Sequence, residues 1–244
     1  MKRHVIDWSV FVLSLGLTAF CCYIIYTEYG DMSLWLNIGL YIAFFASYIL
    51  AAPVHELGHM LFGAFVKIKA VPKFSLRVKG SSSCKIIPKT DKNIKGGLIF
   101  TTCGGLAFNL VFIILGVVAL CVPAVPSGLC VVLPASFYVF ALNIIPFVTA
   151  NGKTDGLVLL ELIKNDDAAK VMLAVLTVQA RVLNGKPIEQ AGEALLFDVP
   201  QIQEDDESFI ALTQLRYEYF AAKGDNEQAE KYKQRFEQLK NEYL

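Results

Sequence analysis

Residues 55–59 read His-Glu-Leu-Gly-His and lie within one of the most apolar stretches of the chain. Positions i and i+4 of a helix share one face, so His55 and His59 can direct a ring nitrogen at the same metal ion. Glu56, one residue further round, is placed to take a proton from a water molecule. An ionisable side chain at membrane depth costs about 2.5–3.5 kcal/mol on insertion scales. Two histidines and a glutamate there indicate a zinc-dependent hydrolytic site in a membrane-embedded helix.

A hydrolytic zinc site needs a third protein ligand and an open position for water. Asp155 follows the last long apolar segment, at the membrane depth expected for His59. The glycine after Asp155 lets the backbone approach the site closely. We therefore expect Asp155 to be the third ligand, with Glu161 as the second choice. His4, the remaining histidine, lies at the far N-terminus.

The elements that must position these residues are long apolar segments. Of the 244 residues 55% are hydrophobic and 18% charged, and the mean hydropathy is +0.50. Since a soluble domain carries about 25% charged residues, this composition favours a membrane protein. We predict a mainly α fold, a polytopic helical bundle with spans near residues 5–26, 34–66, 97–122 and 128–148. The second segment is too long for one upright crossing of ~20 residues, so we expect it to tilt or to break at Pro53.

The basic residues predict the orientation of the chain. Lys2 and Arg3 precede the first span, and residues 67–95 contain nine Lys or Arg against one acid. Short basic loops stay in the cytoplasm, which places both termini there. No signal-peptide cleavage site follows the first span, so we expect a retained anchor. We predict a multi-pass protein of a bacterial cell membrane. The basic loop is flanked by spans and has few aromatics, so we expect no nucleic-acid partner.

The basic loop, residues 67–96, also has the alternation of a β-hairpin, with strands at 71–78 and 84–87. Two interpretations remain open for this cytoplasmic hairpin. It is either an edge strand that pairs with an unwound substrate or a positively charged tether on anionic lipid headgroups.

The six cysteines include no Cys-x-x-Cys pair, and we interpret them as buried thiols. Cys21 or Cys22 could approach Cys121 or Cys130.

The chain divides in prediction into a zinc-binding membrane core, residues 1–165, and a cytoplasmic helical tail, residues 166–244. The tail should contain helices at 168–183, 209–223 and 227–243, the last two forming a hairpin that resembles half of a tetratricopeptide-type repeat. One such repeat cannot bury its own apolar face. We expect the hairpin to pack on the tail or on a second copy of the chain, or to bind a regulatory partner.

Three motifs in order resemble the site-2 protease family of intramembrane zinc metalloproteases, over about residues 45–165. They are the motif at 55–59, Gly104-Gly105-Leu-Ala-Phe-Asn109, and Asn143-Ile-Ile-Pro146 followed by the Asp155-Gly pair. Leu106 replaces the proline that usually follows the second glycine, and the stretch between Pro146 and Asp155 is longer than the family's shortest form.

The resemblance implies zinc held by His55, His59 and Asp155, with Glu56 as the catalytic residue. It also implies that Asn109, Gly105 and Asn151 contribute to substrate binding, and Asn109 could instead only tie two spans together. The expected activity is hydrolysis of a peptide bond in or near a transmembrane segment of a membrane-bound protein or peptide. The alternative is a non-catalytic membrane protein of the same scaffold that acts through partner binding. A metal transporter is a weaker alternative, since the other spans have no further acid within the membrane and Asp7 lies near the cytoplasmic end of the first.

Overall fold

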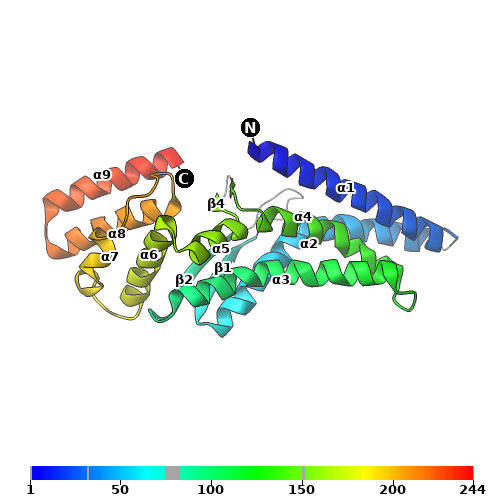
Figure 1. Cartoon of the computed structure of the whole chain (residues 1–244), viewed down its shortest axis with the longest axis horizontal. Coiled ribbons are helices and arrows are strands. Elements are labelled where there is room, and N and C mark those ends of the chain that lie inside the picture. The colour runs from blue at the N-terminus through cyan, green and yellow to red at the C-terminus, as the bar shows by residue number, and fades with distance from the viewer. Residues whose placement is uncertain (1, 32, 75–82, 150–151, 244) are drawn as a thin grey trace. The chain divides into compact units, whose positions relative to one another are not determined.

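The computed structural model of the chain describes residues 2–31, 33–74, 83–149 and 152–243. Helices dominate the described residues, and the strands form two small two-stranded sheets (Figure 1). The helices are α1 Lys2–Tyr29, α2 Leu34–Phe65, α3 Ile94–Cys121, α4 Leu133–Ile144, α5 Asp155–Lys164, α6 Asp167–Leu183, α7 Glu193–Phe197, α8 Glu207–Lys223 and α9 Asn226–Tyr243, with 3-10 helices η1 Ser127–Val132 and η2 Ile188–Gln190. The strands are β1 Ile68–Lys73, β2 Ser83–Pro88, β3 Val148–Thr149 and β4 Gly152–Lys153.

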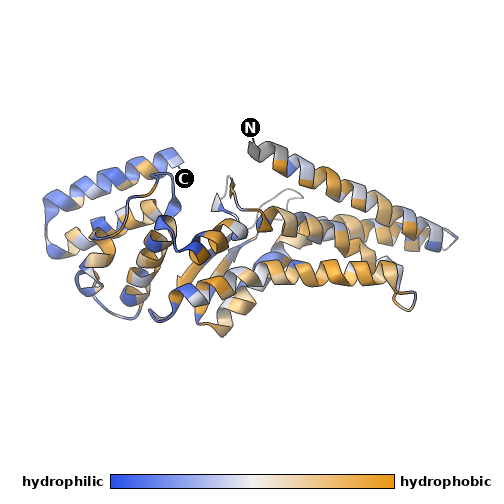
Figure 2. Cartoon of the chain, viewed as in Figure 1, coloured by the Kyte–Doolittle hydropathy of each residue, from blue (hydrophilic) through white to orange (hydrophobic). Residues whose placement is uncertain are grey.

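Four helical segments are long and apolar enough to cross a membrane, namely α1, α2, α3 and the continuous run η1–α4. They appear as mostly apolar ribbons in Figure 2, whereas α9 is mostly hydrophilic. This confirms the predicted number of apolar spanning helices. The helix α2 runs through Pro53 without a break. We expected this segment either to tilt or to break at Pro53, and the predicted break is wrong. The fourth segment ends at Ile144, earlier than predicted, because Ile145 precedes a proline and is extended.

The chain divides into two compact units, each of which combines separate stretches of sequence. The first unit comprises Met1–Phe62, Val71–Lys85 and Thr101–Leu157. In this unit α1 packs against α4 and η1. Asp7, an acid in the first span, accepts a hydrogen bond of 3.0 Å from Tyr138 of α4. Cys21 and Cys130 are both fully buried in one apolar cluster, and all six cysteines are free thiols.

At the place of the predicted β-hairpin, strands β1 and β2 pair with each other in a two-stranded sheet. The first strand begins at Ile68, three residues before the predicted start, because Ile68 and Ala70 continue the alternation and are buried while Lys69 is exposed. The predicted turn of this hairpin, residues 75–82, lies outside the described residues.

The second unit comprises Gly63–Ala70, Ile86–Phe100 and Val158–Leu244. Its C-terminal helices α6, α8 and α9 match the predicted ranges closely. The hairpin of α8 and α9 turns at Gly224, whose φ of 76° is the left-handed conformation that glycine adopts at a helix end. Its apolar face packs on α6, α7 and η2, so the tail itself covers the half-repeat. The buried core of this part is Val171, Val175, Val178, Ala191, Leu196, Leu212, Leu215 and Tyr219.

Candidate metal centre

Close packing of α2 on α3 builds one wall of the candidate site. A Cβ atom added to Gly58 would lie 2.3 Å from the carbonyl oxygen of Gly104, and one added to Gly104 would lie 2.5 Å from that of Gly58. The two backbones therefore touch where the helices meet, and only glycine allows this distance. A Cβ atom on Gly105 would lie 2.6 Å from Nε2 of His59 and 2.7 Å from Cε1 of His55. The backbone of α3 at Gly105 thus lies against both imidazole rings.

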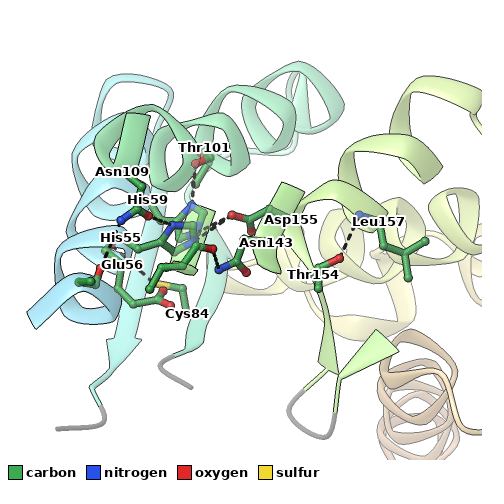
Figure 3. A network of polar contacts seen from close by, with 12 residues as sticks. His55, Glu56, His59, Cys84, Thr101, Asn109, Asn143, Thr154, Asp155 and Leu157 are labelled. Carbon is green, nitrogen blue, oxygen red and sulfur yellow. Dashed lines mark hydrogen bonds and ion pairs between the residues drawn. The ribbon is translucent and has the colours of Figure 1, made fainter. Parts of the chain in front are cut away.

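Two acceptors on α3 orient the two histidines (Figure 3). Nδ1 of His55 lies 2.6 Å from Oδ1 of Asn109, and Nδ1 of His59 lies 2.9 Å from the carbonyl oxygen of Thr101. Because both partners are carbonyl-type oxygens that only accept, each Nδ1 carries the proton and donates it. Each Nε2 is then unprotonated and has its lone pair free. This is the arrangement by which proteins orient metal-binding histidines.

Asp155 completes a triangle of acceptor atoms with these two nitrogens. Oδ2 of Asp155 lies 2.9 Å from Nε2 of His55 and 3.4 Å from Nε2 of His59, and the two nitrogens are 3.1 Å apart. Four ligands around zinc at its usual bond lengths are about 3.3–3.6 Å apart, so the observed separations are close to those of a zinc site. The three atoms come from a buried group that could hold a metal ion, as predicted from the spacing.

The charge of the triangle also fits a cation. The ordinary pKa of an aspartate is about 3.9, and a cation held beside Asp155 would lower it further, so that Asp155 would be a carboxylate at neutral pH. Its Oδ2 is buried and has no hydrogen-bond partner among the described residues. An unpartnered buried carboxylate oxygen facing two lone pairs is costly unless a cation lies between them.

Glu56 is the second buried acid of this region, with 5% of its surface exposed. Its Oε2 has no hydrogen-bond partner within the described part of the chain. Figure 3 shows Glu56 beside His55, with Cys84 of β2 next to it. The Cys84 thiol lies 4.0 Å from the backbone carbonyl oxygen of Glu56. The strand β2 therefore approaches the helical turn that carries the motif. Oε2 of Glu56 is available to accept a proton.

The structure brings together four of the predicted site residues, His55, Glu56, His59 and Asp155. Gly105 and Asn109 contact the histidines, while their predicted part in substrate binding stays a prediction. Asn151 lies outside the described residues, and the side chain of His4 is likewise not described. Glu161 is buried but does not belong to the group that can share a metal ion.

Sequence reasoning missed the residues that hold the ligands in place. The carbonyl of Thr101 has no sequence signal, because any residue supplies a carbonyl. Thr154, the residue before Asp155, donates its hydroxyl to the carbonyl oxygen of Ile145 and accepts from the N–H of Leu157. The sequence does carry a signal for this residue, since a threonine directly before a helix is a typical N-cap. Compared with protein-family models, curated proteins and solved structures, the chain gives no match.

Proposed function

We propose that this protein is a zinc-dependent endopeptidase that hydrolyses a peptide bond in or near a transmembrane segment of a membrane-bound protein or peptide. The observation that carries the proposal is the triangle of His55, His59 and Asp155 at 2.9–3.4 Å, together with the buried Glu56 next to His55, whose Oε2 has no hydrogen-bond partner among the described residues. A structural metal site would be closed by four protein ligands. Three ligands and an adjacent free acid instead favour catalysis.

The residues divide the chemistry between them. Zinc held by His55, His59 and Asp155 would acidify a water molecule and polarise the substrate carbonyl. Glu56 accepts the proton of the attacking water at its free Oε2. Glu56 then passes this proton to the amide nitrogen, so that the C–N bond breaks and an amine and a carboxylic acid result. Burial of Glu56 among apolar helices keeps competing water away from this transfer.

The substrate must present an extended backbone, because a helix hides its carbonyl groups in internal hydrogen bonds. The hairpin of β1 and β2 is near enough to help, since Cys84 of β2 lies 4.0 Å from the Glu56 carbonyl. An extended segment could pair with an edge of this hairpin. The lysines of the same hairpin are equally suited to anionic headgroups, which remains the second interpretation.

The proposal includes a location and a family. Four apolar helices support a multi-pass membrane protein. The basic loop supports cytoplasmic termini and a site near the cytoplasmic face of a bacterial cell membrane. The three ordered motifs support membership of the site-2 protease family.

The test compares wild type with Glu56→Gln, which removes the base but none of the three proposed ligands. Both proteins are expressed in cells whose membrane-protein fragments are identified by mass spectrometry of new N-termini. We expect fragments cut in or near transmembrane segments with wild type alone, and zinc in both purified proteins. Glu237→Gln, an exposed acid on α9, is the matched control and should cleave like wild type.

Two results would contradict the proposal. Purified wild type that contains no zinc and takes none up would remove the metal site. Full cleavage by Glu56→Gln would remove Glu56 from the mechanism. Fragments that are identical in all three cultures, together with a cellular phenotype lost on deletion of residues 184–244, would favour the non-catalytic alternative.

A further inference from the structure

Thr154, the residue before the proposed ligand Asp155, is almost fully buried and uses its hydroxyl three times. Its relative exposure is 3%. Oγ1 donates to the carbonyl oxygen of Ile145 at 2.8 Å and accepts from the backbone N–H of Phe147 at 3.2 Å and of Leu157 at 3.4 Å. One hydroxyl can donate once and accept twice, so its capacity is filled. Figure 3 shows the contact between Thr154 and Leu157.

These contacts join the two elements on either side of Thr154. In the small sheet β3–β4, Val148 pairs with Lys153 and Thr149 with Gly152, and the next pair outward is Phe147 with Thr154. The N–H of Thr154 donates to the carbonyl of Phe147 at 3.1 Å. The return bond from Phe147 goes to the Thr154 hydroxyl and not to its backbone carbonyl.

The backbone carbonyl of Thr154 is thereby left to start a helix. It accepts from the N–H of Leu157 at 3.0 Å, and the hydroxyl contacts that same N–H as an N-cap does. The chain therefore changes from strand to helix within one residue, and Asp155 is the first residue of α5. Without the hydroxyl, the N–H of Phe147 and the carbonyl of Ile145 would lose this partner, while the N–H of Leu157 would keep its bond to the Thr154 carbonyl.

A second contact holds the other side of Asp155. A Cβ atom on Gly156 would lie 2.1 Å from the carbonyl oxygen of Ile144, so the first turn of α5 rests directly on the end of α4. Asp155 thus lies between two anchored residues, Thr154 with its hydroxyl bonds and Gly156 with its backbone contact. Neither anchor involves the carboxylate of Asp155. The two neighbours therefore hold the backbone of Asp155, and with it the point from which the side chain starts.

We propose that Thr154 is a positioning residue that sets the third ligand of the metal site by tying the backbone at Ile145 and Phe147 to the start of α5. This rests on the proposed metal site. Thr154 makes no contact with the ligand atoms, so it acts through the backbone of Asp155. Residues that orient metal ligands typically change metal affinity by about 10–100-fold when they are replaced.

The experiment measures zinc affinity of the purified full-length protein by competition with a chromophoric chelator. Thr154→Val keeps the shape and removes the hydroxyl, and we expect zinc binding at least about 10-fold weaker. Thr154→Ser keeps the hydroxyl and should restore the affinity to within about threefold of wild type. The matched control is Thr213→Val, a buried threonine of α8 whose hydroxyl bonds only to its own helix at the Phe209 carbonyl, and it should bind zinc like wild type.

The Tm of each zinc-free protein separates positioning from general stability. A lower zinc-free Tm in Thr154→Val with unchanged zinc affinity would overturn the proposal, because it is the result expected of a merely structural threonine. Equal weakening by Thr154→Ser and Thr154→Val would also overturn it. If Thr154→Val does not fold, the zinc affinity of Thr154→Ala is measured in its place. A zinc affinity of Thr154→Ala within threefold of wild type would contradict the positioning role of Thr154.

Failure of the underlying site looks different from failure of the positioning role of Thr154. Wild type that binds no zinc, or His55→Ala that binds it as well as wild type, removes the proposed metal site. Wild type that binds zinc, a His55→Ala variant that does not, and a Thr154→Val variant equal to wild type remove only the role of Thr154.

Discussion

Oδ1 of Asn109 lies 2.6 Å from Nδ1 of His55, and Asn109 is fully buried on α3. The amide nitrogen of Asn109 lies 3.5 Å from the carbonyl oxygen of Ala51 on α2. Both ends of the amide therefore face α2, one toward the proposed ligand and one toward the helix backbone. This geometry supports a role in orienting His55, in addition to the bond between spans that the sequence suggested.

Asn109→Leu keeps the side-chain size and removes the acceptor, so His55 loses the partner that fixes its tautomer. We expect zinc affinity to fall about 10–100-fold. The measurement is chelator competition with purified protein. Asn37→Leu is the control, since Asn37 of α2 also donates its amide to a backbone carbonyl, that of Tyr29, and lies outside the proposed site. Unchanged zinc affinity combined with lost cleavage would instead favour the substrate-binding role of Asn109.

Gly105 is the position where an added methyl group should damage the site most directly. In Gly105→Ala the new Cβ would lie 2.6 Å from Nε2 of His59, so the rings or the helices must shift. We expect loss of zinc binding by at least about 10-fold, with the helical content retained. Gly39→Ala on α2 is the control, because nothing lies within 4 Å of its Cβ. Metal content by plasma mass spectrometry and circular dichroism measure the two effects, and zinc-replete Gly105→Ala would contradict the packing.

The parts of the site that were predictable are those with a local pattern. His55 and His59 are four residues apart on one apolar helix, and Asp155 follows the last span, so spacing and hydropathy predicted all three. The hairpin of α8 and α9 is predictable because the Gly-Asp turn at residues 224–225 separates two helix-forming stretches. Each of these conclusions needs only neighbouring residues.

The contacts that orient the ligands depend on how distant segments meet. The Thr101 carbonyl and Gly105 reach the histidines because α2 and α3 touch at Gly58 and Gly104. The sequence alone does not indicate that these two glycines face each other. The sequence around Pro53, taken alone, predicts a point where α2 could break. The helix continues because a proline removes only one hydrogen bond, and neighbouring helices can compensate in a membrane protein.

Removal of the metal should lower stability, because a ligand that binds only the folded state stabilises it by RT ln(1 + [L]/Kd). At free zinc about 100 times Kd this amounts to about 2.7 kcal/mol. We expect a chelator to lower the Tm of wild type reversibly and to leave Asp155→Asn unchanged. Differential scanning fluorimetry in detergent checks this. A chelator effect of equal size in both proteins would place the metal elsewhere.

The core of the C-terminal helices should be sensitive to loss of a single buried side chain. Leu212 of α8 is 1% exposed and packs within the apolar cluster formed with α6 and α7. Leu212→Ala leaves a cavity and should lower the free energy of unfolding of this region by about 2–5 kcal/mol. Gln214→Ala, an exposed position on the same helix, should change it by less than about 0.5 kcal/mol. Pulse proteolysis of the full-length protein in urea measures both, and equal resistance of the two variants would mean that α8 is not held by this core.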